Sequence, residues 1–346
     1  MRILLITQKV DLNDDNLGFF HRWVEEFAKN VEKICVITQF LGEHNLPANV
    51  EIYSMGKEHG YGRIRRYLNF YKYSLKILPR IDAIFVHMIP LWVILLWKPA
   101  FILRKKMYLW YTHKSVTWTL WLAEKMVTKI FTASKESFRL PSKKVEIMGH
   151  GIDTDYFTPK LELRPREIYR IVSVGRISAS KKIKEMIFGV AELYKILPPE
   201  KRFEFAIIGS PKTREDEAYF AELQNLVGEL KLGDIVKLIG GVSYKEIARE
   251  YQKSHLFLNF SVTGSVDKAV LEAMSCGADV LVANEAFFGM LPEENIIKKP
   301  DVAQLTKKIT QFAFGNAQSH NLRTLVLENH NLETLIKKIT KLLQEE

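Results

Sequence analysis

Short apolar runs alternate along the chain with longer stretches of mixed polarity. In the first half, the runs cover residues 2–7, 33–38, 83–88, 106–112 and 129–134. They are rich in β-branched and aromatic residues, and the stretches between them are long enough for helices. Because strands that alternate with helices form parallel sheets, the pattern predicts an α/β fold. Continuous apolar strands such as Ala83–His87 are typical of sheets covered on both faces.

The same alternation begins again after a polar stretch that contains proline, residues 159–167. The second set of predicted strands covers residues 169–175, 204–209, 236–240, 255–260 and 279–284. A chain of 346 residues exceeds what a single hydrophobic core usually supports. We therefore predict two domains, residues 1–160 and 161–315, with the polar stretch as the linker between them.

Residues 316–346 are predicted to form a helical tail. A helix over residues 301–314 precedes the turn-rich piece Gly315–His320. The tail then continues through Leu332–Leu342, where the apolar residues have helical spacing. We expect this tail to cross toward the first domain and pack on it.

The composition favours a folded protein with anionic partners. Lys and Arg number 50 and Asp and Glu number 40, which gives a net charge of +10. A positive balance favours nucleotides, acidic lipid headgroups or nucleic acid, and charge alone does not choose among them. Cys35 and Cys276 lie in apolar surroundings without paired spacing, so we expect buried thiols in a reducing compartment.

Two apolar segments resemble targeting or membrane-spanning sequences. Met1–Thr7 lacks a small-residue cleavage site and is soon followed by acidic residues, so it predicts a first strand in a cytoplasmic protein. Residues 84–103 are also apolar. Polar residues and prolines interrupt this second run at His87, Pro90, Lys98 and Pro99. We favour a buried strand followed by a helix that begins at proline over a spanning helix.

The most informative segment runs from Leu256 to Gly277 and predicts a strand, a small-residue loop and a short helix that ends at glycine. The loop and helix start supply backbone N–H groups for an anion at Ser265, Val266, Asp267 and Lys268. Gly264 allows a ligand to approach closely. Glu272 is then placed to accept hydrogen bonds from a sugar diol. The alternative is an i, i+4 pair between Glu272 and Lys268 on an exposed helix, and spacing does not separate the two.

A second segment, Ile171–Lys182, places Arg176 and Lys181 in the loop between a buried strand and the next helix. Ligands of open α/β sheets bind at this carboxyl edge, and a diphosphate leaving group needs cationic donors. The alternative is that these lysines only solvate a helix start. Cations oppose the dipole at a helix N-terminus, which weakens that alternative.

Four motifs together resemble a known family. They are Val174–Lys181, Leu271–Gly277, Gly149–Phe157 and the opening loop Asp14–His21. The chain is similar over nearly its whole length to the retaining family 4 glycosyltransferases, also called glycosyl transferases group 1. The resemblance implies the GT-B fold, in which two Rossmann-like domains face each other across a cleft.

The resemblance also implies a reaction and a donor site. A sugar would pass with retention from a nucleoside diphosphate of UDP or GDP type to a hydroxyl of a glycan or lipid-linked acceptor. Arg176 and Lys181 would contact the donor diphosphate and help the leaving group, and Glu272 would contact the ribose. The expected donor-binding set is Gly18, Gly175, Arg176, Lys181, Gly264, Ser265, Val266, Asp267, Lys268 and Glu272. Neither a cofactor nor a metal is expected.

One position departs from the family pattern. The family often carries two glutamates separated by seven residues, the first of which contacts the donor sugar, and Gly264 occupies that position here. Asp267 is three residues away and would replace the missing carboxylate only in a rearranged loop. We favour the alternative that Asp267 caps the following helix.

The first domain is expected to supply the acceptor side. His113 directly follows a predicted strand at the ligand-binding edge of the sheet, and the resemblance places it beside the transferred sugar as a catalytic residue. A structural role is the alternative for a single histidine. The acceptor-side residues suggested near the opening loop are Asp11, Asp14, His21 and Trp23.

Asp153-Thr-Asp155 has the Asp-x-Asp spacing by which another class of glycosyltransferases holds a divalent metal. Its position directly after Gly151-Ile152 matches the GT-B pattern instead, in which no metal is required. Elsewhere the sequence offers no cluster of carboxylates or histidines at ligand spacing. We therefore expect no metal site.

Basic and aromatic residues alternate in Tyr61–Lys76. This pattern is compatible with nucleic acid, with anionic lipid or with an ordinary amphipathic core helix. The apolar helix from Leu91 and the basic Arg104–Lys106 beyond it favour peripheral contact with the inner face of a membrane and no nucleic acid. Three rivals to glycosyl transfer stay open: a GT-B relative that hydrolyses or epimerises its donor, a catalytically silent nucleotide-sugar-binding protein, and a nucleic-acid binder that only the charge and Tyr61–Lys76 suggest.

Overall fold

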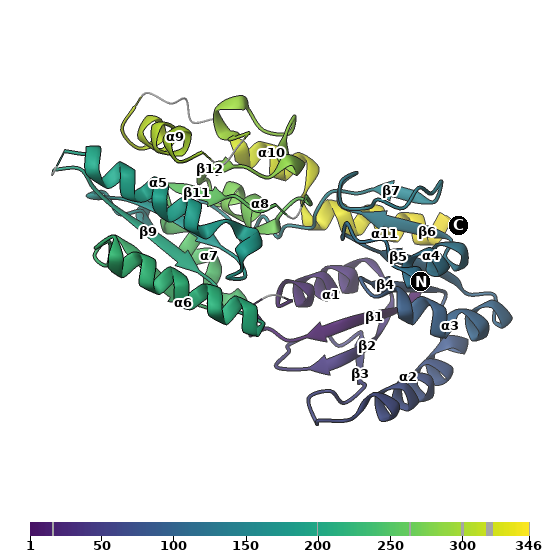
Figure 1. The fold of residues 1–346 in the computed structure, drawn as a ribbon. Helices are drawn as coiled ribbons and strands as arrows, with labels where there is room; N and C mark the ends of the chain where they lie inside the picture. Colours follow the sequence, from purple (N-terminus) through teal and green to yellow (C-terminus); the bar gives the residue numbers. More distant parts are fainter. Residues whose placement is uncertain (16, 199, 263, 299–300, 316–320, 346) are drawn as a thin grey trace. The chain divides into compact units, whose positions relative to one another are not determined.

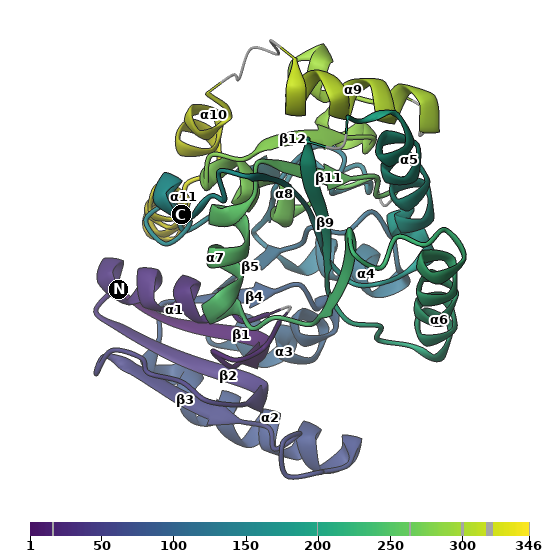
Figure 2. The same ribbon diagram turned by 90° about the vertical axis from the view of Figure 1, so that its left-hand side faces the viewer.

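The computed structural model describes residues 1–346 apart from 16, 199, 263, 299–300, 316–320 and 346 (Figures 1 and 2). Two compact units make up the chain. The first contains residues 1–153, 243–245 and 330–346, and the second contains residues 154–242 and 246–329. Each unit is built around its own parallel sheet.

In the first unit, the described residues form a parallel sheet in the order β3-β2-β1-β4-β5-β6-β7. The strands are β1 (Arg2–Val10), β2 (Lys33–Leu41), β3 (Val50–Ser54), β4 (Ala83–His87), β5 (Lys106–Trp110), β6 (Lys129–Thr132) and β7 (Val145–Ile147). The strand order reverses between β1 and β4, which are neighbours in the interior of the sheet. The open edge at this reversal is where ligands bind in such folds.

Helices cover both faces of the first sheet. One face packs against α1 (Phe19–Asn30) and α11 (Leu332–Glu345). The other packs against α2 (Arg63–Ile77), α3 (Pro90–Ile102) and α4 (Trp118–Met126). Ile3 and Leu5 of β1 point to the first face, and Leu4 and Ile6 point to the second. The continuous apolar strand thus supplies two cores because its side chains alternate.

The second unit contains a parallel sheet in the order β10-β9-β8-β11-β12. Its strands are β8 (Ile168–Val174), β9 (Arg202–Ile208), β10 (Val236–Gly240), β11 (Leu256–Asn259) and β12 (Asp279–Val282). Its helices are α5 (Ile183–Ile196), α6 (Arg214–Glu229), most of α7 (Tyr244–Lys253), α8 (Lys268–Ser275), α9 (Val302–Phe314) and α10 (Leu322–Asn329). The order reverses between β8 and β11.

Short 3₁₀ helices complete the described structure. They are η1 (Leu78–Arg80), η2 (Leu161–Leu163), η3 (Ala179–Lys181), η4 (Glu285–Phe287) and η5 (Glu293–Asn295). η3 contains Lys181 and directly precedes α5, so the loop after β8 is itself wound into a turn.

All predicted strands are present, and two further strands were missed. β3 and β7 are short edge strands that are at most half-buried, so they lack a strong apolar run. α10 lies within the segment predicted as a helical tail, and the predicted turn lies outside the described residues apart from Gly315. The predicted helices over 301–314 and 332–342 are confirmed as α9 and α11.

The apolar residues 84–103 form a strand and a helix that begins at proline, as predicted. β4 ends at His87, and α3 begins at Pro90. No described helix has the length and apolar character needed to cross a bilayer. Cys35 and Cys276 are both buried and unpaired, which confirms the prediction of buried thiols.

The tail helix α11 belongs to the first unit and packs on α1 there. Leu335, Ile336 and Ile339 are buried in the same core as Trp23 and Phe27. The second unit begins at Thr154, so Pro159–Glu167 lies inside it. Residues 322–329 also belong to the second unit, although they fall within the segment predicted as the tail.

Candidate functional site

A small pocket lies at the strand-order reversal of the second sheet. It is lined by the ends of β8 and β11 and by the loop that leads into α5, including Gly175, Arg176, Lys181, Asn259 and Phe260. Three of the predicted donor residues, Gly175, Arg176 and Lys181, therefore lie together in this pocket. The first two belong to the loop after β8, and Lys181 belongs to η3. The location agrees with the rule that ligands of open α/β sheets bind at a reversal of strand order.

Two glycines let neighbouring strand ends approach closely beneath this pocket. Gly209, after β9, has a φ of +149°, and a Cβ atom there would lie 1.8 Å from the carbonyl oxygen of Gly175. Gly175 has a φ of +150°, and its N–H donates to the carbonyl of Ile208 at 3.0 Å. Sequence analysis identified Gly175 and missed Gly209. Only glycine fits at position 209, because any side chain would collide with backbone.

The Lys181 ammonium group is held at the pocket by the loop that precedes α8. Its Nζ donates to Oδ2 of Asp267 at 2.9 Å and lies 3.5 Å from Oγ of Ser261. The side chains of Lys181 and Asp267 are 20% and 17% exposed, respectively. Asn259, at the end of β11, donates its Nδ2 to the same Asp267 oxygen at 2.9 Å. Lys181 is therefore positioned in advance and remains accessible to an anion.

The predicted capping role of Asp267 is wrong. Asp267 occupies the N-cap position of α8, but its side chain accepts no hydrogen bond from the helix. Its carboxylate instead accepts from Lys181 and Asn259, because an ion pair to a lysine is stronger than a bond to a neutral N–H group. Asn259 is a residue that sequence analysis missed. Its position at the end of a strand beside the reversal was the available signal.

Arg176 lies on the open side of the same pocket. Its side chain is 52% exposed, and its Nε is 3.8 Å from Oδ2 of Asp216 in α6. Such a long, exposed pair contributes little stability, so the guanidinium group can turn toward a ligand at small cost. Asp216 is itself fixed, because its Oδ2 accepts from the backbone N–H of Lys212 at 3.2 Å.

Glu272 lies on a buried face of α8, so the alternative is wrong in its exposed setting, although Lys268 and Glu272 do interact electrostatically. The residue is 8% exposed, and its Oε2 accepts from the Tyr251 hydroxyl at 3.0 Å. Burial raises the pKa of Glu272, and the neighbouring Lys268 and Tyr251 act against that rise. Burial also lowers the pKa of Lys268, an effect that the Glu272 charge reduces. The two groups are electrostatically coupled within the protein and not across solvent.

The loop before α8 has the backbone conformation that the sequence suggests. Gly264 has a φ of +66°, a conformation that favours glycine. The carbonyl of Ser265 accepts from Nδ2 of Asn284 at 2.8 Å, and the side chain of Val266 is buried. The loop is thus anchored directly before the helix start, where the dipole of α8 favours an anion.

The suggested acceptor-side residues of the first unit have mainly structural contacts. His21 and Trp23 lie inside α1 and are 1% and 2% exposed, so their assignment to an exposed opening loop is wrong. Trp23 donates its Nε1 to the carbonyl of Gly151 at 3.3 Å. Burial lowers the pKa of His21 to about 4. The helix begins one residue after Gly18, earlier than the loop motif indicated.

Asp11, Asp14 and Gly18 shape the loop between β1 and α1. Lys9 forms ion pairs with both aspartates, at 3.4 Å to Asp11 and 2.5 Å to Asp14. The N–H of Gly18 donates to the carbonyl of Asp14 at 3.2 Å. The aspartates are partly exposed at the carboxyl end of β1. Their role toward a ligand remains a prediction.

His113 lies in the loop that follows β5 and is exposed. Its Nδ1 accepts from the backbone N–H of Ser115 at 3.1 Å. Thr112 and Met88 meet beside it, with the Thr112 hydroxyl 3.3 Å from the Met88 sulfur. The position at the carboxyl edge of the sheet is the one predicted, and the catalytic role stays a prediction.

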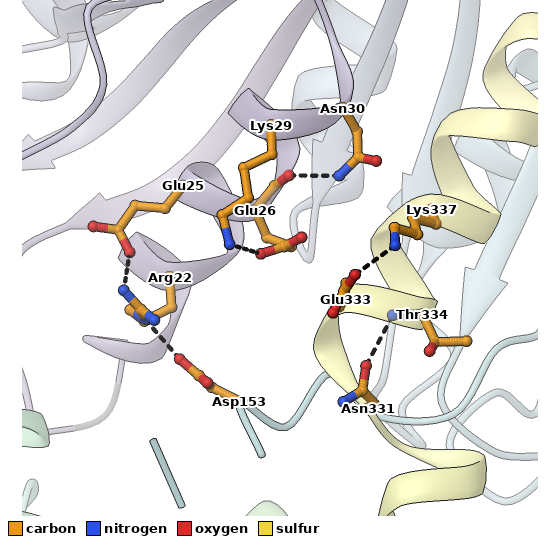
Figure 3. Close-up of polar contacts among 10 residues, drawn as sticks. All are labelled: Arg22, Glu25, Glu26, Lys29, Asn30, Asp153, Asn331, Glu333, Thr334 and Lys337. Atoms are coloured by element: carbon orange, nitrogen blue, oxygen red, sulfur yellow. Dashed lines mark hydrogen bonds and ion pairs between the residues drawn. The ribbon is translucent and has the colours of Figure 1, made fainter. Parts of the chain in front are cut away.

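Asp153 is held by an arginine of the first unit. Nε of Arg22 in α1 donates to Oδ2 of Asp153 at 2.7 Å, and Figure 3 shows the same arginine between Asp153 and Glu25. Asp153 is 7% exposed. Among the described residues, no group of three or more His, Cys, Asp and Glu side chains is arranged to hold a metal ion.

Residues 159–324 match the family described as glycosyl transferases group 1. The resemblance that the motifs indicate is confirmed for this part of the chain. Amylovoran biosynthesis glycosyltransferase AmsK of Erwinia amylovora is 29% identical over 164 residues, which are 45% of this chain and 38% of the relative. One polypeptide of the human phosphatidylinositol N-acetylglucosaminyltransferase is 26% identical over 208 residues, which are 59% and 41% of the two chains. These matches span about two fifths of the relatives' length.

Solved structures extend the likeness of fold to the whole chain. Anabaena HepE in complex with UDP and glucose has a TM-score of 0.78 at 15% identity, with 100% of both chains covered. Sucrose-phosphate synthase from Thermosynechococcus elongatus has a TM-score of 0.76 at 17% identity and covers 100% of this chain and 98% of its own. The predicted α/β fold with two Rossmann-like domains of GT-B type is confirmed.

Proposed function

We propose that the protein is a retaining glycosyltransferase that moves a sugar from a nucleoside diphosphate to an acceptor hydroxyl. The observation that carries the proposal is the meeting of Gly175, Arg176 and Lys181 in one pocket at the strand-order reversal of a family-matched domain. Two cations and a close backbone approach suit a diphosphate. Anabaena HepE, of the same fold, was solved with UDP and with UDP-glucose.

The donor is oriented by contacts on opposite sides of the pocket. Lys181 and Arg176 bind the diphosphate oxygens, and the N-terminus of α8 adds its dipole. Glu272, held by the Tyr251 hydroxyl, accepts from the ribose diol. Ser265, Val266 and Lys268 supply the backbone of that helix start, and Gly264 leaves room for the donor.

The chemistry relies on charge stabilisation. Negative charge develops on the diphosphate as the bond to the sugar breaks, and Arg176 and Lys181 stabilise it. A diphosphate oxygen then takes the proton of the acceptor hydroxyl on the same face of the sugar, so that the configuration is retained. His113 contacts the transferred sugar, and no metal takes part. Asp11 and Asp14 border the acceptor, a glycan or lipid-linked hydroxyl in cell-envelope or glycolipid synthesis.

A donor-binding protein without transfer activity is the second candidate, and Gly264 is the observation that favours it. A glycine offers no side chain to the sugar, and the nearby Asp267 is engaged by Lys181 and Asn259. A protein that hydrolyses or epimerises its donor without an acceptor is a variant of this candidate. Both retain the diphosphate site and lose the transfer step.

The test combines a binding screen with a transfer assay. Nucleoside diphosphates and their sugars are screened by thermal shift, because a ligand that binds the folded state raises its apparent stability. The stabilising donor is then incubated with acceptor pools, and Lys181→Ala is compared with Lys184→Ala. Lys184 is exposed and pairs with Glu222 outside the pocket.

Lys181→Ala is expected to lower the rate of transfer about a hundredfold or more, because it removes a cation from the developing charge. Lys184→Ala should keep the wild-type rate. Equal rates for Lys181→Ala and the wild type would contradict the assignment. Donor binding without turnover in any acceptor pool would favour the second candidate, and donor loss without acceptor would favour hydrolysis or epimerisation.

A further inference from the structure

The net positive charge of the chain is concentrated in one segment. Residues 59–123 contain 11 of the 50 Lys and Arg residues and one of the 40 Asp and Glu residues, Asp82, which leaves 39 of each elsewhere. The rest of the chain is therefore neutral overall. The cations of the segment are Arg63, Arg65, Arg66, Lys72, Lys76, Arg80, Lys98, Arg104, Lys105, Lys106 and Lys114. A charge imbalance on this scale favours an extended anionic partner.

Ion pairs are common elsewhere in the first unit, for example between Arg2 and Glu32 and between Lys29 and Glu26. Within the described segment 59–123, none of the eleven cations forms an ion pair with a described carboxylate. The nearest acidic neighbours in sequence, Glu58 and Glu124, pair with His59 and Lys125. The segment's charge is thus left for a partner.

The same segment exposes large apolar side chains. Among the described residues, 12 of the 21 exposed large hydrophobic residues lie in it. They are Ile64, Tyr67, Leu68, Tyr71, Leu75, Trp97, Phe101, Ile102, Leu103, Val116, Trp118 and Trp121. Ile64 is 79% exposed, Trp118 72% and Phe101 70%. Exposed apolar residues that gather together mark an interaction surface, whereas scattered ones do not.

These residues belong to one layer of helices. α2, α3 and α4 cover the face of the first sheet opposite to α1 and α11, and Figure 1 shows α2 on the side of the sheet away from α1. Tyr71 of α2 donates its hydroxyl to the carbonyl of Leu95 in α3 at 3.2 Å. A pocket between α3, β5 and α4 is lined by Trp97, Phe101 and three cations, Arg104, Lys105 and Lys106.

We propose that the exposed side chains of residues 59–123, the α2–α4 surface, dock on an anionic phospholipid bilayer. Tryptophan and tyrosine prefer the membrane interface, and lysine and arginine beside them attract acidic headgroups. The helices lie on the bilayer and do not cross it. α3 has 13 residues and is therefore about 20 Å long, against a hydrocarbon core of about 30 Å.

The apolar residues distinguish a bilayer from other anionic partners. Nucleic acid binds cations and flat rings, but Ile64, Leu68 and Ile102 would gain nothing from a sugar-phosphate backbone. A second copy of the chain would bring like charges together, which is costly in an interface. An anionic bilayer offers both a charged surface and an apolar interior within a few ångströms.

The experiment measures flotation of the full chain with vesicles of phosphatidylcholine alone and of phosphatidylcholine with phosphatidylglycerol. Binding is expected only to the anionic vesicles and should weaken as salt rises. One variant reverses two cations, Lys72→Glu with Lys98→Glu. Another removes two rings, Trp118→Ser with Trp121→Ser. These substitutions lie on exposed positions, so the fold is retained.

Each variant has a matched control. Lys307→Glu with Lys338→Glu changes the net charge equally at exposed positions of α9 and α11. Phe188→Ser with Tyr194→Ser removes two exposed rings of α5, which are 40% and 54% exposed. Each cation near an anionic membrane strengthens binding about fivefold, so the double reversal should weaken it roughly a hundredfold or more. The ring variant should lose about tenfold or more, and the controls should stay close to the wild type.

Equal binding to neutral and anionic vesicles, or equal losses in the variants and their controls, would overturn the proposal. So would failure to bind vesicles combined with binding to single-stranded or duplex nucleic acid, or with a dimer that Trp118→Ser and Trp121→Ser dissociate. Nucleotide binding in the second unit is an independent measurement. If no nucleotide binds while vesicle binding persists, the proposed function is contradicted and the membrane-docking proposal is retained.

Discussion

Asp267 holds the ammonium group that the proposed donor diphosphate would need, so the two anions would compete for it. In the structure, Lys181 donates to Asp267 Oδ2 at 2.9 Å, and that oxygen also accepts from Asn259. Substitution of Asp267 by Asn removes the negative charge and keeps a side-chain oxygen to which Asn259 and Lys181 can still donate. We therefore expect Asp267→Asn to bind nucleoside diphosphates more tightly than the wild type.

The size of the effect follows from Coulomb's law. At a carboxylate-to-phosphate separation of roughly 6 Å and an effective dielectric constant of about 20, one unit of repulsion is about 3 kcal/mol. Both side chains of the pair are about one fifth exposed, so solvent screens part of this repulsion. A net change of about 1–2 kcal/mol then remains, which corresponds to roughly tenfold tighter binding.

Isothermal titration calorimetry with UDP and GDP measures the change directly. Asp234→Asn is the control, because it makes the same change in charge at an exposed position of the second unit. The advantage of Asp267→Asn should shrink as salt rises. Unchanged affinity would show that Asp267 does not oppose the diphosphate. Weaker binding would refute the reasoning outright and assign Asp267 a direct contact with the donor.

Two further predictions concern stability. Gly209→Ala should lower the free energy of unfolding by about 3 kcal/mol or more, because the new methyl group meets the Gly175 carbonyl. Gly228→Ala is the control and should not lower the free energy of unfolding, since Gly228 lies in α6 with open space around it. Urea denaturation measures both variants. Burial lowers the pKa of His330 to about 4, so between pH 6.5 and 4 the unfolded chain binds a proton that the folded chain excludes. As the pH falls from 6.5 to 4, the free energy of unfolding should decrease by up to about 3 kcal/mol. His330→Gln should flatten the fall, and the same slope in His330→Gln and in the exposed control His59→Gln would contradict this cause.

The alternation of strands and helices could be predicted because each strand carries its own apolar signal. β1 and β4 are buried on both faces, and their continuous apolar runs were sufficient. β7 has three residues, none of them fully buried, so the sequence contains no comparable signal for it. The sequence therefore predicts the strands whose side chains are buried and misses those whose side chains are only partly buried.

The candidate site was predictable in its location and less so in its contacts. Arg176 and Lys181 directly follow a strand, and a strand end is visible in the sequence. The partner of Lys181 is not, because Asp267 lies 86 residues away and its position depends on how two loops meet. His21 and Trp23 were misplaced for a related reason, since α1 begins at Phe19 without a polar side-chain cap to mark its start.

The first unit is assembled from separated parts of the chain. Residues 1–153 form its sheet, and α11 supplies Leu335, Ile336 and Ile339, which are at most 3% exposed. During translation, the residues of the second unit emerge between these two parts. At about 5–20 residues per second, this interval lasts on the order of ten seconds or more.

Throughout that interval, the core between the nascent sheet and α1, which includes Trp23 and Phe27, lacks α11. The second unit can complete its core before α11 is available to the first unit. Ribosome-associated chaperones would therefore meet this chain first at the uncovered side of α1. A frameshift or early stop in the α11 codons would release a protein whose second unit is intact but whose first unit aggregates.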